Sequence, residues 1–460
     1  MKKLRGHEVF LMAAFAAAVN LLFVFVHECW RDEAQAWLIA RDNNIFSLFD
    51  VTSWEGHPCL WFLTLMPFAR LGFPYFTLKL ISYFIMLAVI IIIALKAPFE
   101  NHIKALFILS PLCIYCFVTP ARVYCLCALF TVLAAMIYKN RLERPFLYGI
   151  VLALNLQTHI IMAGFVVAAC FEWLYSACHD RRFTKKFVYN ILGMAIPFLS
   201  GLFLLYEFRD TFSSPIVTSE HLIIIDRWLI EVCVIIFLTV IIYIWAAKIG
   251  LKAGGASFIV LSAAAWQIYI HLFIYYLHMY KIIIWITFLM WLMWVIYDEN
   301  TQFTQGGGGA FTQSLKKFIT FSTFIIILTM AGHYYYKYTF FDLFYKFSGG
   351  EGAAIALESL PDNAIIFEPP EKVCKSVIPY LRTKKIYSLT LQKNANYTEF
   401  IAAVRKMFPN IKDFWLICNP DSDRIKNLQS YLRDEDLYYT DKDELILMDE
   451  HFSIYHVKLQ

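Results

Sequence analysis

Two adjacent carboxylates follow the first long apolar run of the chain. Asp32 and Glu33 lie in the segment Arg31-Asp32-Glu33-Ala34, and Glu55-Gly56-His57-Pro58 comes later in the same polar stretch. A carboxylate beside a membrane can deprotonate an attacking hydroxyl or amine. Acidic residues also favour the first turn of a helix, where they face the positive end of its dipole. By themselves these residues fit either a catalytic role or a solvated helix start.

Further polar and ionisable side chains stand at the ends of other apolar runs. They are Arg122, Tyr124, His159, His278, Tyr280 and Lys281. Ionisable groups at membrane depth are costly and usually functional. Taken singly, each cation could reach the lipid headgroups along its own stem, and His159 could be a helix-packing donor. Independent snorkelling does not explain why acids, histidines and cations all fall on one side.

Composition predicts the elements that must position these residues. The chain of 460 residues is 60% hydrophobic and only 17% charged. A span needs about 20 mostly apolar residues, and such runs recur, so we expect about eleven transmembrane helices. The expected helices cover about 8–27, 75–95, 102–118, 123–138, 145–158, 160–178, 188–206, 228–247, 256–276, 282–297 and 318–334.

Charge predicts the orientation of these helices. One alternating set of loops holds more than twice as many Lys and Arg residues as the other, which places the N-terminus in the cytoplasm and the C-terminal tail outside. The stretch 60–71 is apolar but short and contains Pro67 and Arg70, so we place it flat on the outer interface. The stretch 33–49 mixes apolar and charged residues and suggests interfacial helix. The outer loop 28–74 completes a transmembrane module over residues 1–334.

The tail, residues 345–460, has a different composition. Short apolar strands alternate with amphipathic helices, which is typical of a small α/β domain. The expected strands are 364–367, 414–417, 445–447 and 454–457, and the expected helices are 397–408 and 424–433. The 11 cysteines are odd in number, and most lie in or beside apolar runs, which argues against a disulfide scaffold. Cys374 and Cys418 of the tail could still pair.

Cations and a carboxylate at an outer membrane interface suit one kind of chemistry. The cations would hold a lipid-linked phosphate, and the carboxylate would activate an acceptor. The chain has no nucleotide-binding motif, and its net charge of +4 gives no reason to expect nucleic acid. A polyprenyl-phosphate donor fits the membrane location. The residues therefore favour group transfer from a lipid phosphate.

Several motifs resemble the GT-C fold glycosyltransferases, and most closely the bacterial relatives of protein O-mannosyltransferases and of aminoarabinose transferase. Arg-Asp-Glu-Ala followed by Gly-His-Pro resembles their first outer loop. Ala121-Arg122-Val123-Tyr124 is similar to an Arg-x-Tyr helix start, Gln157-Thr158-His159 to a Thr-His turn, and Lys79-Leu80-Ile81-Ser82 to an Arg-Leu-x-Ser stretch. Leu277-His278-Met279-Tyr280 departs from the family's Arg-His-x-Gly, so Lys281 is the candidate for the missing cation. The resemblance covers residues 1 to about 334.

The resemblance implies roles for these residues. Asp32 would be the catalytic base, Glu33 would support it, and His57 would orient it or the acceptor. The donor phosphate would bind Arg122, Tyr124, His278 and Lys281, while Glu55, His159 and Tyr280 would contact the acceptor or line the cavity. Direct displacement would invert the anomeric carbon. The resemblance leaves the need for a metal open, because members of the family differ, and Asp32, Glu33 and His57 could form an incomplete site for a divalent metal.

The expected protein is thus a polytopic α-helical membrane glycosyltransferase with a small extracytoplasmic α/β domain. Its partners would be a polyprenyl-phosphate-linked sugar, membrane lipids and an acceptor protein, lipid or glycan. The expected location is a bacterial plasma membrane. A transporter or flippase is the alternative, but no internal repeat is visible and the ionisable residues gather at one face. A structural subunit that lost activity is a second alternative, which the intact Asp32-Glu33 pair disfavours.

Overall fold

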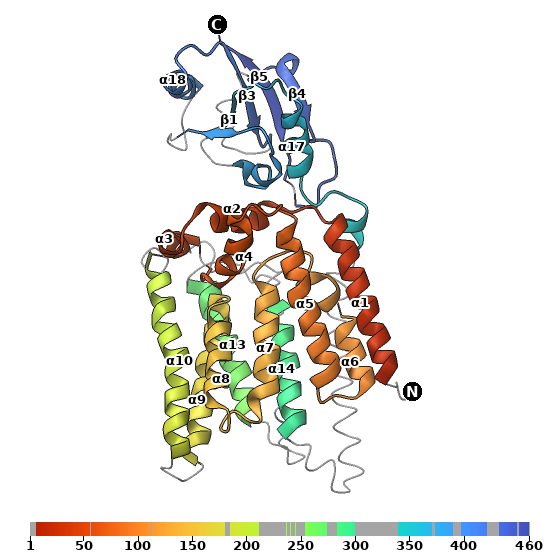
Figure 1. Ribbon diagram of the computed structural model, residues 1–460, viewed down its shortest axis with the longest axis vertical. Coiled ribbons are helices and arrows are strands. Elements are labelled where there is room, and N and C mark those ends of the chain that lie inside the picture. The colour runs from red at the N-terminus through yellow and green to blue at the C-terminus, as the bar shows by residue number, and fades with distance from the viewer. Residues whose placement is uncertain are drawn as a thin grey trace. The chain divides into compact units, whose positions relative to one another are not determined.

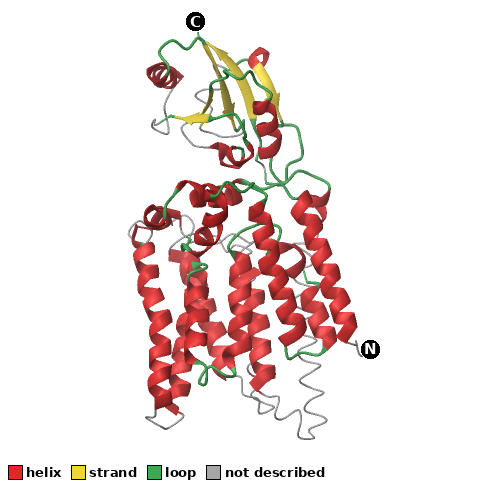
Figure 2. Cartoon of the chain, viewed as in Figure 1, coloured by secondary structure: helices red, strands yellow, loops and turns green. Residues whose placement is uncertain are grey.

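In the computed structural model the chain folds mainly into helices, followed by a small C-terminal sheet (Figures 1 and 2). The structure describes residues 6–55, 57–110, 112–179, 185–210, 254–273, 283–299, 339–369, 373–389, 397–420, 432–448 and 450–459, with the single positions 236, 240 and 244. The chain divides into two compact units. Unit 1 comprises 1–22, 43–65 and 79–334, and unit 2 comprises 23–42, 66–78 and 335–460.

Unit 2 therefore contains more than the tail, because it also takes in two stretches of the expected first outer loop. One of these stretches is the helix α2 (Arg31–Asp42), which carries the paired carboxylates. Three helices divide between the units: α1 (Gly6–Val26), α4 (Leu60–Arg70) and α5 (Thr77–Lys96). The segment expected to lie flat, 60–71, is the helix α4. The expected interfacial stretch 33–49 is covered by α2 and by α3 (Ile45–Glu55) of unit 1.

The remaining helices of unit 1 follow the apolar runs of the sequence. They are α6 (Asn101–Ile108), the π-helical turn η1 (Leu112–Cys116), α7 (Tyr124–Tyr138), α8 (Pro145–Leu156), the 3₁₀ turn η2 (Ile160–Met162), α9 (Ala163–His179), α10 (Lys185–Glu207), α13 (Gly254–Phe273) and α14 (Ile283–Glu299). The expected helix 102–118 is interrupted, since α6 ends at Ile108. The sequence has Pro111 there, and proline lacks the N–H that continues a helix. The expected helices 228–247, except for three positions, and 318–334 lie outside the described residues.

Within the described residues, four helical segments are long and apolar enough to cross a membrane. They are Gly6–Val26, Thr77–Lys96, Ile160–His179 and Lys185–Glu207. Shorter apolar helices cover Tyr124–Tyr138, Pro145–Leu156 and Gly254–Ile270. The chain is therefore a mostly helical protein with candidate membrane spans, and the expected count of about eleven stays a prediction.

Glycines bring the apolar helices of unit 1 into close contact. A Cβ atom at Gly149 of α8 would lie 2.3 Å from the backbone oxygen of Gly193 in α10, and one at Gly164 of α9 would lie 2.3 Å from Cβ of Trp266 in α13. Small residues at such crossings let two backbones approach, which is how helices gain van der Waals contact in a bilayer. These two crossings fix the positions of α8 and α9, the helices on either side of the His159 turn.

The C-terminal domain, which we define as the described residues of 339–459, is built on a five-stranded mixed sheet. Its strands are β1 (Ile366–Glu368), β2 (Ile386–Ser388), β3 (Asp413–Cys418), β4 (Leu437–Thr440) and β5 (Ser453–Lys458), in the order β2-β1-β3-β5-β4. The strands β2, β1 and β3 are parallel, and β5 runs antiparallel to both β3 and β4. The sequence therefore predicted a small sheet domain correctly.

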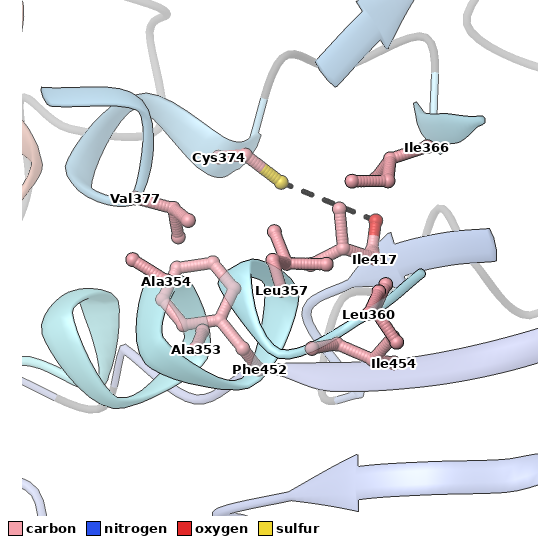
Figure 3. Close-up of a cluster of buried hydrophobic side chains, with 10 residues drawn as sticks. All are labelled: Ala353, Ala354, Leu357, Leu360, Ile366, Cys374, Val377, Ile417, Phe452 and Ile454. Atoms are coloured by element: carbon pink, nitrogen blue, oxygen red, sulfur yellow. Dashed lines mark hydrogen bonds between the residues drawn. The ribbon is translucent and has the colours of Figure 1, made fainter. Parts of the chain in front are cut away.

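Alternating side chains of the sheet build a core on each face. On one face Ile366, Ile417 and Ile454 pack with the helix α17 (Gly350–Glu358) and with Cys374, as Figure 3 shows. On the other face Phe414 and Leu416 pack with the helix α18 (Tyr397–Met407). Cys374 and Cys418 are both buried and free, so the pairing considered from the sequence is not formed.

The predicted elements of the domain match the structure unevenly. The expected elements 364–367, 397–408, 414–417 and 454–457 correspond to β1, α18, β3 and β5. The expected strand 445–447 is wrong, because only Ile446 forms an isolated bridge, with Lys346. The strands β2 and β4 were not predicted. Most of the expected helix 424–433 lies outside the described residues.

Candidate functional site

The structure places the expected site residues in two groups, one in each unit. His57, Arg122, Tyr124 and His159 come together in unit 1, and we call them the cationic cluster. Asp32 and Glu33 belong to unit 2. Glu55 is the last residue of α3 in unit 1 and is half-buried. His278, Tyr280 and Lys281 lie outside the described residues.

Each member of the cationic cluster lies at or just before the start of a helix. His57 precedes α4, Arg122 lies two residues before α7, Tyr124 is the first residue of α7, and His159 is the N-cap of η2, which leads into α9. Helix starts carry unsatisfied N–H groups and the positive end of the helix dipole. The local structure therefore adds positive potential to a guanidinium and two imidazoles.

The members of the cluster touch one another. Nη2 of Arg122 lies 3.2 Å from Nε2 of His57. The rings of His57 and His159 meet edge to face with centroids 4.8 Å apart, and the ring of Tyr124 stacks on His159 at 5.9 Å. The Arg122 guanidinium also lies 5.5 Å from the centre of the Tyr124 ring. Arg122 is 8% exposed and His159 is fully buried, so the cluster is largely removed from water.

The hydrogen bonds within the cluster assign a tautomer to each histidine. The backbone N–H of Ile161 donates to Nδ1 of His159, so the ring proton of His159 belongs on Nε2. Arginine can only donate, so Nε2 of His57 accepts from Arg122 and its proton belongs on Nδ1. Each imidazole thus supplies one N–H donor beside the guanidinium. Such a set of donors suits an anion.

A carboxylate that the sequence did not single out holds the loop of His57. Oε1 of Glu207, at the end of α10, accepts a hydrogen bond of 2.9 Å from the backbone N–H of Cys59. Glu207 is fully buried. It is the last residue of a long apolar run, and no motif pointed to it. Its contact with Cys59 fixes the chain two residues after His57 and just before α4.

An apolar cavity of about 730 Å³ opens beside the turn that carries His159. Leu156 and Ile160, on either side of Gln157-Thr158-His159, both line it. Most of the remaining lining comes from α9 and α10, with Trp266 of α13, and no charged side chain contributes. The indole N–H of Trp266 donates to the Ile160 carbonyl at 2.9 Å, which joins the cavity wall to the turn. The cavity can therefore take a hydrocarbon chain.

In unit 2 the two paired carboxylates have different surroundings. Both lie in the first turn of α2, as the sequence suggested. The Asp32 side chain is 24% exposed and lies 3.7 Å from the Arg31 guanidinium, while the Glu33 side chain is fully buried. Oε2 of Glu33 accepts a hydrogen bond from the backbone N–H of Trp30, which is one half of a capping box. Asp32 is thus the carboxylate of this pair that solvent can reach.

His27 holds Glu33 from the opposite side. Nε2 of His27 lies 3.1 Å from Oε2 of Glu33, and its Nδ1 lies 2.9 Å from Oδ2 of Asp342 in the 3₁₀ turn η6 (Phe341–Leu343). We call these three residues the His27 bridge. Its three side chains are essentially fully buried. Burial by itself lowers the pKa of His27, but the two carboxylates outweigh it and raise the pKa to about 9.

Sequence reasoning missed the His27 bridge. His27 was only the last position of the expected helix 8–27, and Asp342 is separated from it by 315 positions. No local pattern joins residues so far apart. Among the described residues no group of three or more possible ligands could hold a metal ion. The oxygen of Glu33 that faces His27 is already engaged, so we derive no step through a metal.

Comparison of the chain with family models and with curated proteins finds no match.

Proposed function

We propose that the chain is a membrane glycosyltransferase that moves a sugar from a polyprenyl-phosphate donor to an acceptor outside the cytoplasm, with inversion. One observation carries the proposal: a largely buried cationic cluster lies beside an apolar cavity. The two features meet at one turn, since His159 belongs to the cluster and Leu156 and Ile160 line the cavity.

The cluster supports binding of a phosphate. Arg122 offers a fixed fork of donors, each histidine offers one N–H, and three helices begin there. As the bond between sugar and phosphate breaks, negative charge grows on the phosphate. Donors that are already fixed and largely removed from water stabilise that charge more than they stabilise the bound ground state. The cluster would therefore act on the leaving group.

The cavity supports a lipid carrier rather than a soluble nucleotide. Its wall is apolar, and burial of a hydrocarbon chain gains about 0.8 kcal/mol for each CH₂ group. A polyprenyl chain in the cavity would bring its phosphate to the His159 turn. A transporter of lipid phosphates would need the same features, and for that reason turnover, rather than binding, separates the two functions.

Asp32 is our candidate for the catalytic base. Its carboxylate reaches solvent at the start of α2, and it would take the proton of the acceptor hydroxyl or amine as that group attacks the anomeric carbon. Glu33, which the resemblance gives a supporting role beside Asp32, is engaged by His27 and Trp30, which suits support of the helix start. The proposal includes a GT-C architecture with about eleven spans, a cytoplasmic N-terminus and location in a bacterial plasma membrane.

The test is turnover of lipid-linked sugars by the full chain in lipid nanodiscs, which avoid sugar-based detergents. Undecaprenyl phosphate carrying a hexose, an N-acetylhexosamine or a pentose is supplied, and release of undecaprenyl phosphate is followed. Asp32→Asn should lower turnover by about a hundredfold or more. Asp42→Asn, on the exposed side of the same helix, is the matched control. Failure of the wild type to turn over any donor, or equal rates for Asp32→Asn and wild type, would refute the proposal.

A further inference from the structure

Helix α2 is attached to the C-terminal domain by a row of contacts from the segment 27–35. The Glu28 carboxylate accepts from the backbone N–H of Glu351 at the start of α17, at 2.7 Å. The other contacts are the backbone N–H of Cys29 to the Tyr380 hydroxyl at 3.2 Å, the backbone N–H of Arg31 to the Glu450 carboxylate at 3.3 Å, and Nζ of Lys375 to the Gln35 side chain at 2.7 Å.

The His27 bridge differs from these contacts because it needs a charge. Both ring nitrogens of His27 face a carboxylate oxygen, so both must carry a proton to donate. A neutral ring would turn one lone pair toward a buried carboxylate. The titratable groups that face the ring are Glu33 from α2 and Asp342 from η6, with Glu28 next in the chain. The rings of His27 and Phe347 meet edge to face.

The bridge ends at the residue next to Asp32. Glu33 occupies the third position of α2 and also caps the helix through the Trp30 N–H. If His27 releases Glu33, a buried carboxylate is left without its cation and the first turn loses its support. Asp32 lies in that turn.

We propose that His27, Glu33 and Asp342 are positioning residues for Asp32, and that through them the C-terminal domain sets the activity of the membrane enzyme. This role rests on the proposed function, in which Asp32 is the base. In this proposal the C-terminal domain affects the reaction by holding α2, and it does not itself contact the substrate. It also makes activity depend on a cationic His27.

The first experiment measures the bridge without any substrate. Amide exchange of residues 31–42 is followed in full-length protein in nanodiscs between pH 7 and pH 10, with correction for the intrinsic pH dependence of exchange. Asp342→Asn and His27→Gln should speed exchange of the first turn by about a hundredfold. In the wild type, protection should fall as the pH passes about 9. His27→Lys keeps its positive charge to higher pH than histidine does. We therefore expect this variant to protect the first turn, unlike His27→Gln, and to lose that protection only at a higher pH than the wild type.

The second experiment separates positioning from general stability. With the undecaprenyl-phosphate-linked sugar that the wild type turns over, Asp342→Asn should lower kcat while the KM for the donor stays unchanged, and His27→Lys should recover kcat. Asp413→Asn removes an exposed His–Asp pair with His456 in the same domain and serves as the control. Unchanged exchange in Asp342→Asn, or a loss of kcat equal to that of Asp413→Asn, overturns the proposal. If the wild type turns over no donor, the transferase fails, while exchange still decides whether the bridge holds α2.

Discussion

At the scale of single residues, the pKa of a carboxylate in unit 2 depends on its burial and on the groups that face it. Glu28 lies two residues after α1, is 9% exposed, and accepts one hydrogen bond from the start of α17. Burial disfavours its charged form and raises its pKa to about 7, although that hydrogen bond lowers it. The folded state therefore holds this proton more tightly than the unfolded chain. The contribution of protonated Glu28 to the free energy of unfolding is fully present below pH 4.5 and is lost as the pH rises through about 7.

Glu28→Gln removes this titration while keeping an oxygen that can accept from the Glu351 N–H. We expect the variant to match the wild type near pH 5 and to exceed it in thermal stability at pH 8, by up to about 3 kcal/mol in the free energy of unfolding. Melting in nanodiscs at both pH values measures this. A variant that is less stable than wild type at pH 8 would show that the charged form is favoured.

Glu358 shows the opposite behaviour at the end of α17. Its side chain accepts from the backbone N–H groups of Arg382, Thr383 and Lys384 and from the Thr383 hydroxyl. Burial alone would raise its pKa, but these donors outweigh it and lower the pKa to about 2. The stability that it contributes is present above pH 4.5 and is lost as the pH falls through about 2.

Glu358→Gln should release the loop of residues 382–384 while the sheet core remains intact. Neutral glutamine forms weaker hydrogen bonds with backbone donors than a carboxylate does. Faster amide exchange at 382–384, with unchanged exchange in β3 and β5, is the expected result. Equal protection of this loop in variant and wild type would mean that other contacts hold it.

At the scale of whole elements, helix contacts in unit 1 depend on the absence of side chains. The crossing of α8 and α10 places the Gly193 carbonyl where a Cβ of residue 149 would stand. Helix backbone cannot yield as a flexible side chain can, so the two helices must move apart. That movement would loosen the packing of α8 against α10.

Gly149→Ala should therefore destabilise the protein by about 1–3 kcal/mol, although alanine favours helix more than glycine does. Gly254→Ala, at the start of α13, is the control because nothing lies within 4 Å of the added Cβ. Thermal melting of the two variants in nanodiscs compares them. A Gly149→Ala protein as stable as Gly254→Ala would argue against a tight crossing.

Elements defined by local patterns were predictable from the sequence, and those defined by distant partners were not. Hydropathy found α1, α5, α7 and α10, because each has a long continuous apolar run. It missed the break after α6, since hydropathy counts apolar side chains and ignores the missing N–H of Pro111. The strand β2 has only three residues and takes its structure from pairing with β1.

For the candidate site too, the sequence marked the residues that lie in local motifs but not their distant partners. The helix starts at Arg122 and His159 carried motifs, and the structure joins them with His57 and Tyr124. The position of Asp32 and Glu33 in a first turn followed from their acidity. The partners of these residues did not follow: Glu207 and Asp342 approach from elements remote in sequence. Sequence thus indicated which side chains are candidates for the site, while the groups that hold them in place could be identified only from the fold.

At the scale of the whole molecule, the central claim is that unit 1 holds a lipid phosphate through the cationic cluster. Removing Arg122 takes the guanidinium from this cluster and leaves the apolar cavity in place. Hydrogen bonds to charged groups contribute about 1.5–3 kcal/mol, so Arg122→Ala should weaken binding by about tenfold to a hundredfold. Arg209→Ala removes an equal charge from an exposed pair with Asp50 in the same unit and should bind as the wild type does.

The most direct measurement is binding of undecaprenyl phosphate to the full chain in nanodiscs, with wild type, Arg122→Ala, Arg209→Ala and Asp32→Asn compared. The account predicts binding by the wild type, a loss confined to Arg122→Ala, and retained binding by Asp32→Asn. Absence of binding by the wild type, or equal losses in Arg122→Ala and Arg209→Ala, would contradict it.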